Sequence, residues 1–315
     1  MLRIHFLDVG HGDCTIVEHP SGNITMVDIN NGRRYDWKTL CELAEEYLGW
    51  TPLAVAVLGE ETVCRDLWMA GYETPLVNPL DYLAQHFPNR PVHRYIQSHP
   101  DLDHMRGFDA LMQRCRVLNF WDTANTKVIA DFRDDTDEAD WLRYQFTRGG
   151  GYSNVTLLNC YADDRAPLFN RDADGTGYGD GIEILSPTPD LVHWCNARGD
   201  SNNLSYVLRL HYGGRTIVLG GDAEDEAWSR MVACYGPALT CDVLKASHHG
   251  RDSGFHAEAV DLMAPQVVVV SVGRKPNTDA HAKYAWRAQS VLSTRRWGTL
   301  VLTVHPNGAM EWQTV

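Results

Sequence analysis

Short apolar runs of strand length, each bounded by polar or turn-forming residues, recur along the first part of the chain. Pro20-Ser21-Gly22 separates two of these runs and predicts a tight hairpin between them. Asp28 ends one run, so polar side chains are expected where strands stop. The predicted strands of this part are 2–7, 14–19, 23–28, 92–97 and 117–121.

Helical spacing occupies the stretches between these strands. Trp37, Leu40 and Ala44 recur at intervals of three and four residues, with Asp36 as a candidate N-cap. The other helices of this part are expected from Asn78, over 105–113 and after the acidic run that begins at Asp134.

From residue 182 onward, predicted strands and helices alternate. Gly213-Gly214 predicts a two-residue hairpin between two of the strands. Hairpins mixed with helical crossovers indicate a layered α/β fold. The predicted strands are 182–185, 204–211, 215–220, 242–246, 266–272 and 299–304, and the predicted helices are 224–233, 255–262 and 281–293.

Composition narrows the class of protein. The 315 residues suffice for a sizeable core, and 44% hydrophobic with 22% charged residues is ordinary for a soluble globular protein. No apolar run approaches the roughly 18 residues of a spanning helix, and Asp8 interrupts the N-terminal segment, so we expect a cytoplasmic protein without a membrane span. Eight cysteines without a C-x-x-C pair favour reduced thiols over a cysteine-based zinc site.

The net charge of −13 bears on the partners of the protein. Proteins that bind duplexes without sequence preference usually carry a basic surplus, because neutralising phosphates supplies their affinity. This chain lacks such a surplus overall. A nucleic-acid substrate would therefore call for a local basic patch or for a protein partner that supplies access.

Four candidate metal ligands fall within six residues of the segment Ser98–Gly107, directly after the predicted strand 92–97. They are His99, Asp101, Asp103 and His104. Imidazole nitrogens together with carboxylate oxygens at a strand end suit divalent cations. The alternative interpretation is a solvated polar turn before a helix.

Other strand ends carry similar side chains. Asp222 follows the strand 215–220, and His248-His249 follow the strand 242–246. Asn277 and His281 follow the strand 266–272. Asp222 could instead cap a helix, and the histidines could be ordinary loop residues. The aspartates at 172, 174 and 180 lack the full twelve-residue calcium pattern, so a solvated loop is the preferred interpretation there.

The chain resembles the metallo-β-lactamase fold, specifically the soluble hydrolase domain of the competence protein ComEC. The matching segments occur in the order of that family and run nearly end to end. They are D-V-G-H-G-D (8–13), M-V-D-I-N (26–30), S-H-P-D-L-D-H-M-R-G (98–107), S-N-N-L-S-Y-V-L-R-L (201–210), L-G-G-D (219–222), V-L-K-A-S-H-H-G (243–250), S-V-G (271–273) and H-P-N-G (305–308).

The resemblance implies an α/β fold, a four-layer αβ/βα sandwich, as a single domain over 1–315 with insertions at about 33–92 and 122–181. It also implies two divalent metal ions, zinc or manganese, with magnesium as a further option. His99 and Asp101 would bind the first ion, and Asp103 and His104 the second. Asp222 would bridge them, His248 would complete the second site with His249 beside it, and Asp28 would orient the cluster. Which of the two adjacent histidines is the ligand stays open.

Two departures from the wider superfamily, both shared with the ComEC branch, and one departure from that branch matter. Position 101 is aspartate where most relatives have histidine, and Gly199–Asn203 contains no histidine for the first metal. An oxygen-rich first site favours manganese or magnesium, with Asp200 or Asn202 as alternative ligands or with the site left weak or empty. Near the C-terminus, 277–282 retain only the Asn and the His of the usual motif, so His281 is a weaker candidate.

The resemblance implies a hydrolase that uses a metal-activated hydroxide. Asp103, His249, His281 and Lys245 are the candidate catalytic residues, the last three as groups that steady charge or protonate the leaving group. We expect a phosphodiesterase or nuclease acting on nucleic acid or nucleotides. One alternative is hydrolysis of a small phosphoester or another small substrate. Another is an interaction module with an incomplete metal site, which would use Trp37, Tyr47, Trp50, Trp68, Trp121 and Trp141.

Overall fold

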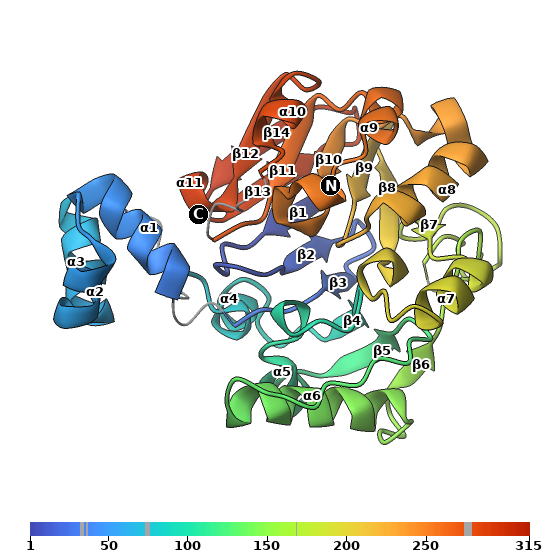
Figure 1. Cartoon of the computed structure of the whole chain (residues 1–315). Coiled ribbons are helices and arrows are strands. Elements are labelled where there is room, and N and C mark those ends of the chain that lie inside the picture. Colours follow the sequence, from blue (N-terminus) through green and yellow to red (C-terminus); the bar gives the residue numbers. More distant parts are fainter. Residues whose placement is uncertain (32–34, 36, 73–75, 168, 274–278) are drawn as a thin grey trace.

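Two β-sheets pack face to face, with helices on their outer sides (Figure 1). The computed structural model describes residues 1–31, 35, 37–72, 76–167, 169–273 and 279–315. The eight strands of the first sheet lie in the order β14 (Met310–Thr314), β13 (Leu300–Val304), β1 (Leu2–Phe6), β2 (Thr15–Glu18), β3 (Ile24–Val27), β4 (Val92–Ile96), β5 (Val117–Trp121) and β6 (Thr156–Leu158).

Six of the described strands form the second sheet, which includes the strands predicted from residue 182 onward except 299–304, the β13 of the first sheet. Their order is β12 (Ser290–Ser293), β11 (Val267–Val270), β10 (Val243–Lys245), β9 (Arg215–Leu219), β8 (Val207–Tyr212) and β7 (Ile182–Ser186). Strands β3 to β6 are parallel to one another, and so are β9 to β12. Within each of these sets, the carboxyl ends of the strands therefore lie at one edge of the sheet.

Helices cover both outer faces. The first sheet packs against α4 (Pro79–His86), α5 (Phe108–Arg114) and α6 (Asp135–Arg148). The second sheet packs against α7 (Pro189–Asn196), α8 (Asp225–Tyr235), α9 (Ala257–Met263) and α10 (His281–Ala285), and the short α11 (Thr294–Trp297) leads into β13.

The strands are apolar on both faces, which accounts for their nearly continuous hydrophobic runs. In β9, Ile217 and Leu219 pack into the core between the sheets, whereas Val218 packs against the outer helices. In β10, Val243 and Leu244 divide in the same way. This arrangement confirms the predicted four-layer αβ/βα sandwich.

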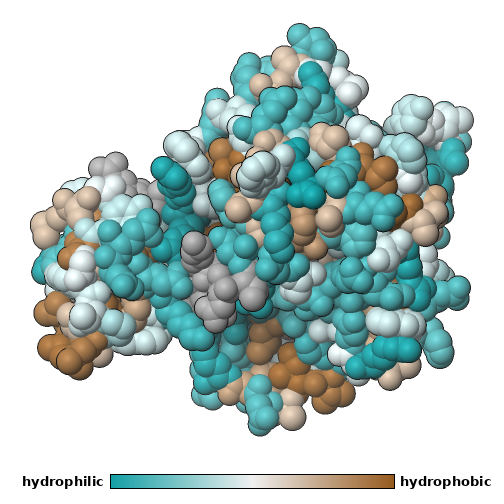
Figure 2. All heavy atoms as spheres, turned by 45° about the horizontal axis from the view of Figure 1, so that its top comes forward, coloured by the Kyte–Doolittle hydropathy of each residue, from teal (hydrophilic) through white to brown (hydrophobic). Residues whose placement is uncertain are grey.

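Three helices form a lobe beside the sandwich (Figure 1). The lobe consists of α1 (Trp37–Leu48), α2 (Pro52–Leu58) and α3 (Glu60–Met69), which share a separate hydrophobic core. Arg295 joins the lobe to the sandwich through ion pairs with Glu42 (2.6 Å) and Glu46 (2.9 Å). Figure 2 shows hydrophobic residues at the outer end of the lobe, and its most exposed large apolar side chains are Leu53, Val57, Trp68 and Met69.

Part of the predicted pattern is wrong. The helix expected over 281–293 ends at Ala285, and 290–293 form strand β12 instead. Val291 and Leu292 fit either a helix or a strand, and parallel pairing with Val268 and Val269 of β11 decides between them. Helix α7 and strand β14 were not predicted from the sequence. Both predicted hairpins are present, one between β2 and β3 and the other between β8 and β9.

The predicted insertions contain the lobe and α4 in the first case, and α6 and β6 in the second. The limits of the two insertions, the assignment of residues 1–315 to a single domain and the cytoplasmic location all stay predictions. Asp36 and Asn277 lie outside the described residues. Among the residues that are described, the structure contains no helix with the length and apolar character needed to cross a membrane.

Candidate metal centre

The candidate ligands gather where the carboxyl ends of parallel strands from both sheets meet. Asp28 follows β3, the segment from Ser98 follows β4, Asp222 follows β9 and His249 follows β10. Backbone contacts join the two sheets here, because the Tyr206 amide donates to the carbonyl of Ser98 at 3.0 Å. Ligands that are far apart in sequence thus become neighbours at one joint edge.

Four buried side chains form the centre of the cluster. The donor atoms of Asp13, His104, Asp222 and His249 all lie within 4.8 Å of one another. Asp222 Oδ2 lies 3.2 Å from His104 Nε2 and 3.5 Å from His249 Nε2, and Asp103 Oδ2 lies 3.4 Å from His249 Nε2. Ligands about 2.1 Å from a tetrahedral ion are about 3.4 Å apart, so this spacing fits a bound cation.

The same atoms are short of hydrogen-bonding partners. His99 Nε2, His104 Nε2, His249 Nε2 and Asp222 Oδ1 are buried without a hydrogen bond in the described structure. Buried polar atoms are normally paired, because leaving one unpaired costs about 1–3 kcal/mol. Several such atoms facing one point indicate a site for a cation.

Electrostatics lead to the same conclusion. Burial opposes ionisation of Asp222 and Asp103, but the neighbouring His104 and His249 outweigh it and hold the pKa of each carboxyl well below its usual value. Burial also opposes the charged form of His104, yet Asp222 and Asp28 raise its pKa well above the usual value. The buried carboxylates are therefore stabilised as anions by positive charge beside them, which either protons on the histidines or a metal ion can supply.

Outer hydrogen bonds fix the histidine tautomers. His104 Nδ1 donates to Asp28 Oδ2 at 2.8 Å, and His249 Nδ1 donates to the carbonyl of Ser271 at 3.1 Å. Asp28 also accepts from the Ser98 amide (2.7 Å) and hydroxyl (2.6 Å). With Nδ1 occupied as a donor, Nε2 of each imidazole presents its lone pair to the cluster, as metal-binding histidines commonly do.

The two adjacent histidines have different environments. His249 is buried and contributes Nε2 to the cluster. His248 turns its Nδ1 to Glu224 (2.7 Å), and its Nε2 is 3.9 Å from Asp222 Oδ2. Both have positive φ (49° and 54°), which is uncommon for residues other than glycine and recurs in functional loops. The geometry places His249, rather than His248, among the potential ligands.

Asp13 belongs to the cluster although no role was assigned to it from the sequence. It lies between β1 and β2 and accepts from Lys245 Nζ at 2.5 Å, in a pair that is buried on both sides. Lys245 therefore holds Asp13 in place. The turn needs Gly12, where φ is +152° and an added Cβ would lie 2.4 Å from the Asp103 carbonyl oxygen. The D-V-G-H-G-D motif was the available signal for this residue.

His11 and Arg251 are further residues that the sequence did not single out. The donor atoms of His11, Asp103 and His249 form a second close group. The Arg251 guanidinium lies 3.2 Å from His11 Nε2 and 3.2 Å from His248 Nε2. A fixed positive charge therefore lies beside the cluster.

The first predicted metal site is arranged differently. His99 Nε2 lies 3.8 Å from Asp101 Oδ1 and 3.8 Å from Asp222 Oδ2. Asp101 Oδ1 also accepts from Lys127 Nζ at 2.5 Å. The first site thus has two of its expected donors in place and an ammonium group beside one of them.

The remaining candidates lie apart from these donors. The Asp200 carboxylate accepts from the amide and the side chain of Asn203, and Asn202 donates to Glu224. His281 is exposed at the start of α10, next to Ala280, whose amide donates to the Gly250 carbonyl at 2.9 Å. The backbone of His281 is therefore anchored near the centre while its side chain is exposed to solvent.

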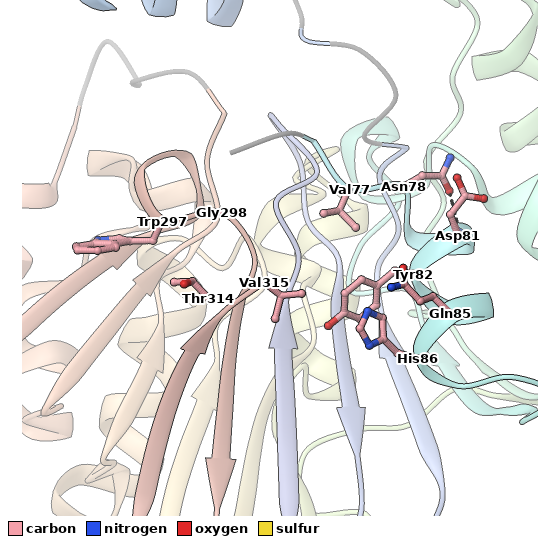
Figure 3. Close-up of a pocket in the computed structure, with 10 residues that line it drawn as sticks. All are labelled: Val77, Asn78, Asp81, Tyr82, Gln85, His86, Trp297, Gly298, Thr314 and Val315. Atoms are coloured by element: carbon pink, nitrogen blue, oxygen red, sulfur yellow. Dashed lines mark hydrogen bonds between the residues drawn. The ribbon is translucent and has the colours of Figure 1, made fainter. Parts of the chain in front are cut away.

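Two pockets flank different parts of the molecule. One, of about 620 Å³, borders the cluster at His11 and Asn30 and extends to Trp37, Arg106 and Arg133. The other, of about 550 Å³, lies between α4 and the end of β14 (Figure 3). In Figure 3, side chains of α4 lie across from Trp297 and Val315, and no candidate ligand lines this second pocket. The first pocket is therefore the one next to the candidate chemistry.

Comparisons with known proteins complete this description. No model of a known protein family matches the chain. A segment of 134 residues, 42% of the chain, is 29% identical to ComE operon protein 3 of Bacillus subtilis (strain 168). Another of 74 residues, 24% of the chain, is 31% identical to competence protein ComA of Neisseria gonorrhoeae. The matched segments span 16% and 11% of those two proteins, so less than a fifth of either is represented.

Among solved structures, YhfI from Bacillus subtilis, a metallo-β-lactamase fold protein, aligns with 99% of this chain and 100% of its own, at 10% identity and a TM-score of 0.47. The chain thus resembles the competence proteins in sequence over the matched segments, and its motifs and two facing sheets are those expected of the metallo-β-lactamase fold.

Proposed function

We propose that the protein is a metal-dependent hydrolase that cleaves phosphodiesters, with nucleic acid or nucleotides as the substrate class. The observation that carries the proposal is the set of buried, unpartnered donor atoms of His104, Asp222 and His249, which converge at the joint edge of the two sheets. Single unpaired buried atoms occur elsewhere in the described structure, such as Trp121 Nε1, whereas several converge here, as a ligand role requires.

The donor set suits zinc or manganese, since it combines imidazole nitrogens with carboxylate oxygens. His104, Asp222 and His249 would hold the ion together with Asp103, whose Oδ2 lies 3.4 Å from His249 Nε2. Asp13, the fourth member of the buried group, is already paired with Lys245 and would lie against the ion. A cation bound there would lower the pKa of a water molecule and polarise a phosphoryl oxygen. The resemblance implies a second ion at His99 and Asp101, whose surroundings differ, as described above.

The surrounding residues are arranged for a phosphate group. Arg251 is fixed beside the cluster and would neutralise phosphoryl oxygens, since guanidinium groups pair well with them. His248, held by Glu224 through Nδ1, accepts from Arg251 at Nε2 and would orient that guanidinium. Lys245 acts through Asp13, with which it is paired.

The adjacent pocket supports a nucleotide as part of the substrate. It is lined by Trp37, whose side chain is about half exposed, by Arg106 and Arg133, and by three aspartates, of which Asp137 pairs with both arginines. An exposed aromatic ring can stack on a base, so the tryptophan is the feature of the pocket that suits a nucleotide. The overall acidity of the chain agrees better with a short or locally bound substrate than with tight binding to long duplexes.

The test compares the wild-type protein with Asp222→Asn and with Asp225→Asn, a control whose side chain is 91% exposed on α8. Each is assayed with manganese, zinc and magnesium on single-stranded DNA, RNA, a generic phosphodiester and a phosphomonoester. We expect metal-dependent phosphodiester cleavage that is retained in Asp225→Asn and falls in Asp222→Asn by more than the 10–100-fold typical of residues outside the ligand set.

Two results would contradict the proposal. One is equal activity of the wild type and Asp222→Asn, which would show that any cleavage does not depend on this centre. The other is activity on the phosphomonoester alone, which would assign the same centre to small phosphoesters. Circular dichroism of each variant excludes loss of fold as the cause.

A further inference from the structure

A lysine side chain lies at the first of the two predicted metal sites. Lys127 Nζ donates to Asp101 Oδ1 at 2.5 Å and to the Ser201 hydroxyl at 3.1 Å. Both charged side chains are mostly shielded, with 27% of the lysine and 29% of the aspartate exposed. The ammonium group thus bridges two segments that are separate in sequence.

These two segments are the ones from which a first metal would take its ligands. Asp101 Oδ1 is the carboxylate oxygen that lies 3.8 Å from His99 Nε2, so an ion between these residues would need this oxygen. Lys127 already neutralises it. A divalent cation there would also lie close to the ammonium charge, and the two would repel each other.

The third ligand of a first site is missing as well. The segment 199–203 has no histidine, and its oxygen-bearing residues bind elsewhere in the protein. Asp200 accepts from Asn203 at 2.7 Å, and Asn202 donates to Glu224 at 3.2 Å. Ser201, the residue between them, accepts from Lys127. Lys127 therefore contacts Asp101, an expected ligand of the first metal, and also the segment 199–203, which lacks the expected histidine.

The backbone around the lysine is held in place. The Thr126 amide donates to Asn196 Oδ1 at 3.0 Å, and Asn196 Nδ2 donates to the Ala124 carbonyl at 2.9 Å. The Lys127 amide itself donates to Asn125 Oδ1 at 3.3 Å. These contacts to the end of α7 present the side chain toward Asp101 as part of the fold.

We propose that the Lys127 ammonium group takes the place of the first metal ion, so that each chain binds one divalent cation, at Asp103, His104, Asp222 and His249. The inference rests on the proposed metal centre and restricts it to a single ion. Asp101 then positions the lysine, and the lysine supplies a positive charge that removing metal leaves in place. His99 Nε2 lies 3.8 Å from Asp222 Oδ2, at the edge of the single site.

The first test is the metal content of the wild-type protein. The protein is loaded with zinc or with manganese, freed of excess metal, and measured by elemental analysis and by calorimetric titration. We expect one equivalent per chain for either metal. Two equivalents would overturn this inference and leave the proposed metal centre intact, whereas no bound metal would overturn the centre and, with it, the inference.

The second test removes the ammonium group. Lys127→Met retains the length of the side chain without its charge, so a second equivalent of manganese is expected to bind between His99 and Asp101. Lys127→Arg retains the charge and should still bind one equivalent. Lys283→Met serves as the control, because Lys283 pairs with Asp252 at the surface (2.8 Å) and should leave the stoichiometry unchanged.

Manganese pairs also give an exchange-coupled electron paramagnetic resonance signal. That signal is expected in Lys127→Met only, at the metal loading at which its second equivalent binds. A single equivalent in folded Lys127→Met, with no coupled signal, would show that the lysine is not the group that excludes a second ion, and would overturn the inference.

Discussion

Two buried groups of charged side chains, one around Asp180 and one around Asp222, use their polar atoms in opposite ways. Asp180 Oδ1 accepts from Ser21, and Oδ2 accepts from Asn23 and from Arg94 Nη2 at 2.5 Å. Its backbone carbonyl lies 3.1 Å from His19 Nδ1. All the oxygen atoms of Asp180 thus have partners.

Asp222 has the same side chain in a similarly buried position, but Oδ1 has no hydrogen bond in the described structure and Oδ2 faces imidazole nitrogens. A paired network fastens one segment to another, as Asp180 fastens the loop before β7 to the hairpin of β2 and β3. A network with unpaired atoms that face one point is arranged for something outside the chain. Pairing of the atoms, more than residue type or burial, separates the two roles.

The largest effect on stability is expected at Asp180. Asp180→Asn would leave the guanidinium of Arg94, whose side chain is 1% exposed, without its countercharge. The free energy of unfolding should fall by about 3–5 kcal/mol, because an uncompensated charge remains buried. Urea denaturation measures this change. Metal affinity should stay at the wild-type value, and a parallel loss of metal binding would contradict the distinction between the two networks.

A smaller effect, on metal affinity, is expected at Asp28. This carboxylate orients His104 through the 2.8 Å contact with Nδ1 and accepts two hydrogen bonds from Ser98. Asp28→Asn should weaken metal binding by about 10–100-fold, in the range typical of residues that orient a ligand. Calorimetric titration with zinc measures the change. Unchanged affinity would indicate that His104 needs no such support.

The smallest expected effect is a difference in pH dependence. Burial alone would raise the pKa of Asp180, but His19 and Arg94 outweigh it and lower the pKa to about 2 from 3.8. The stabilisation is therefore complete above pH about 4 and is lost as the pH falls from there through about 2. The difference in unfolding free energy between the wild type and Asp180→Asn should shrink over this range. A difference that stays constant down to pH 2 would contradict the assigned pKa.

Much of the fold could be predicted because the strands are nearly continuous apolar runs and the turns carry glycine or proline. The apolar runs of β9 and β10 are long enough to be recognised and end where the expectation placed them within a residue or two. The failure at 281–293 has a physical cause. A short run such as Val291-Leu292 satisfies either period, and only pairing with β11 makes it a strand.

The candidate centre shows the same division between what local sequence determines and what contacts between distant segments determine. Sequence by itself determined which residues stand at strand ends with the chemistry of ligands, including His99, Asp101, Asp103, His104 and Asp222, because this depends on local order along the chain. It left the choice between the adjacent histidines open. The backbone at 248–249, with positive φ at both residues, turns one imidazole inward and the other to Glu224.

Only the tertiary structure decided what surrounds each ligand. Lys245 is paired with Asp13 across 232 residues of sequence, and Lys127 reaches Asp101 from a loop that no pattern connected with the centre. These contacts depend on how the two sheets pack against each other and on loops that are anchored to helices distant in sequence. The number of ions that a metal site holds depends on every charge within a few ångströms and therefore on the fold, whereas the candidate ligands could be found in the sequence.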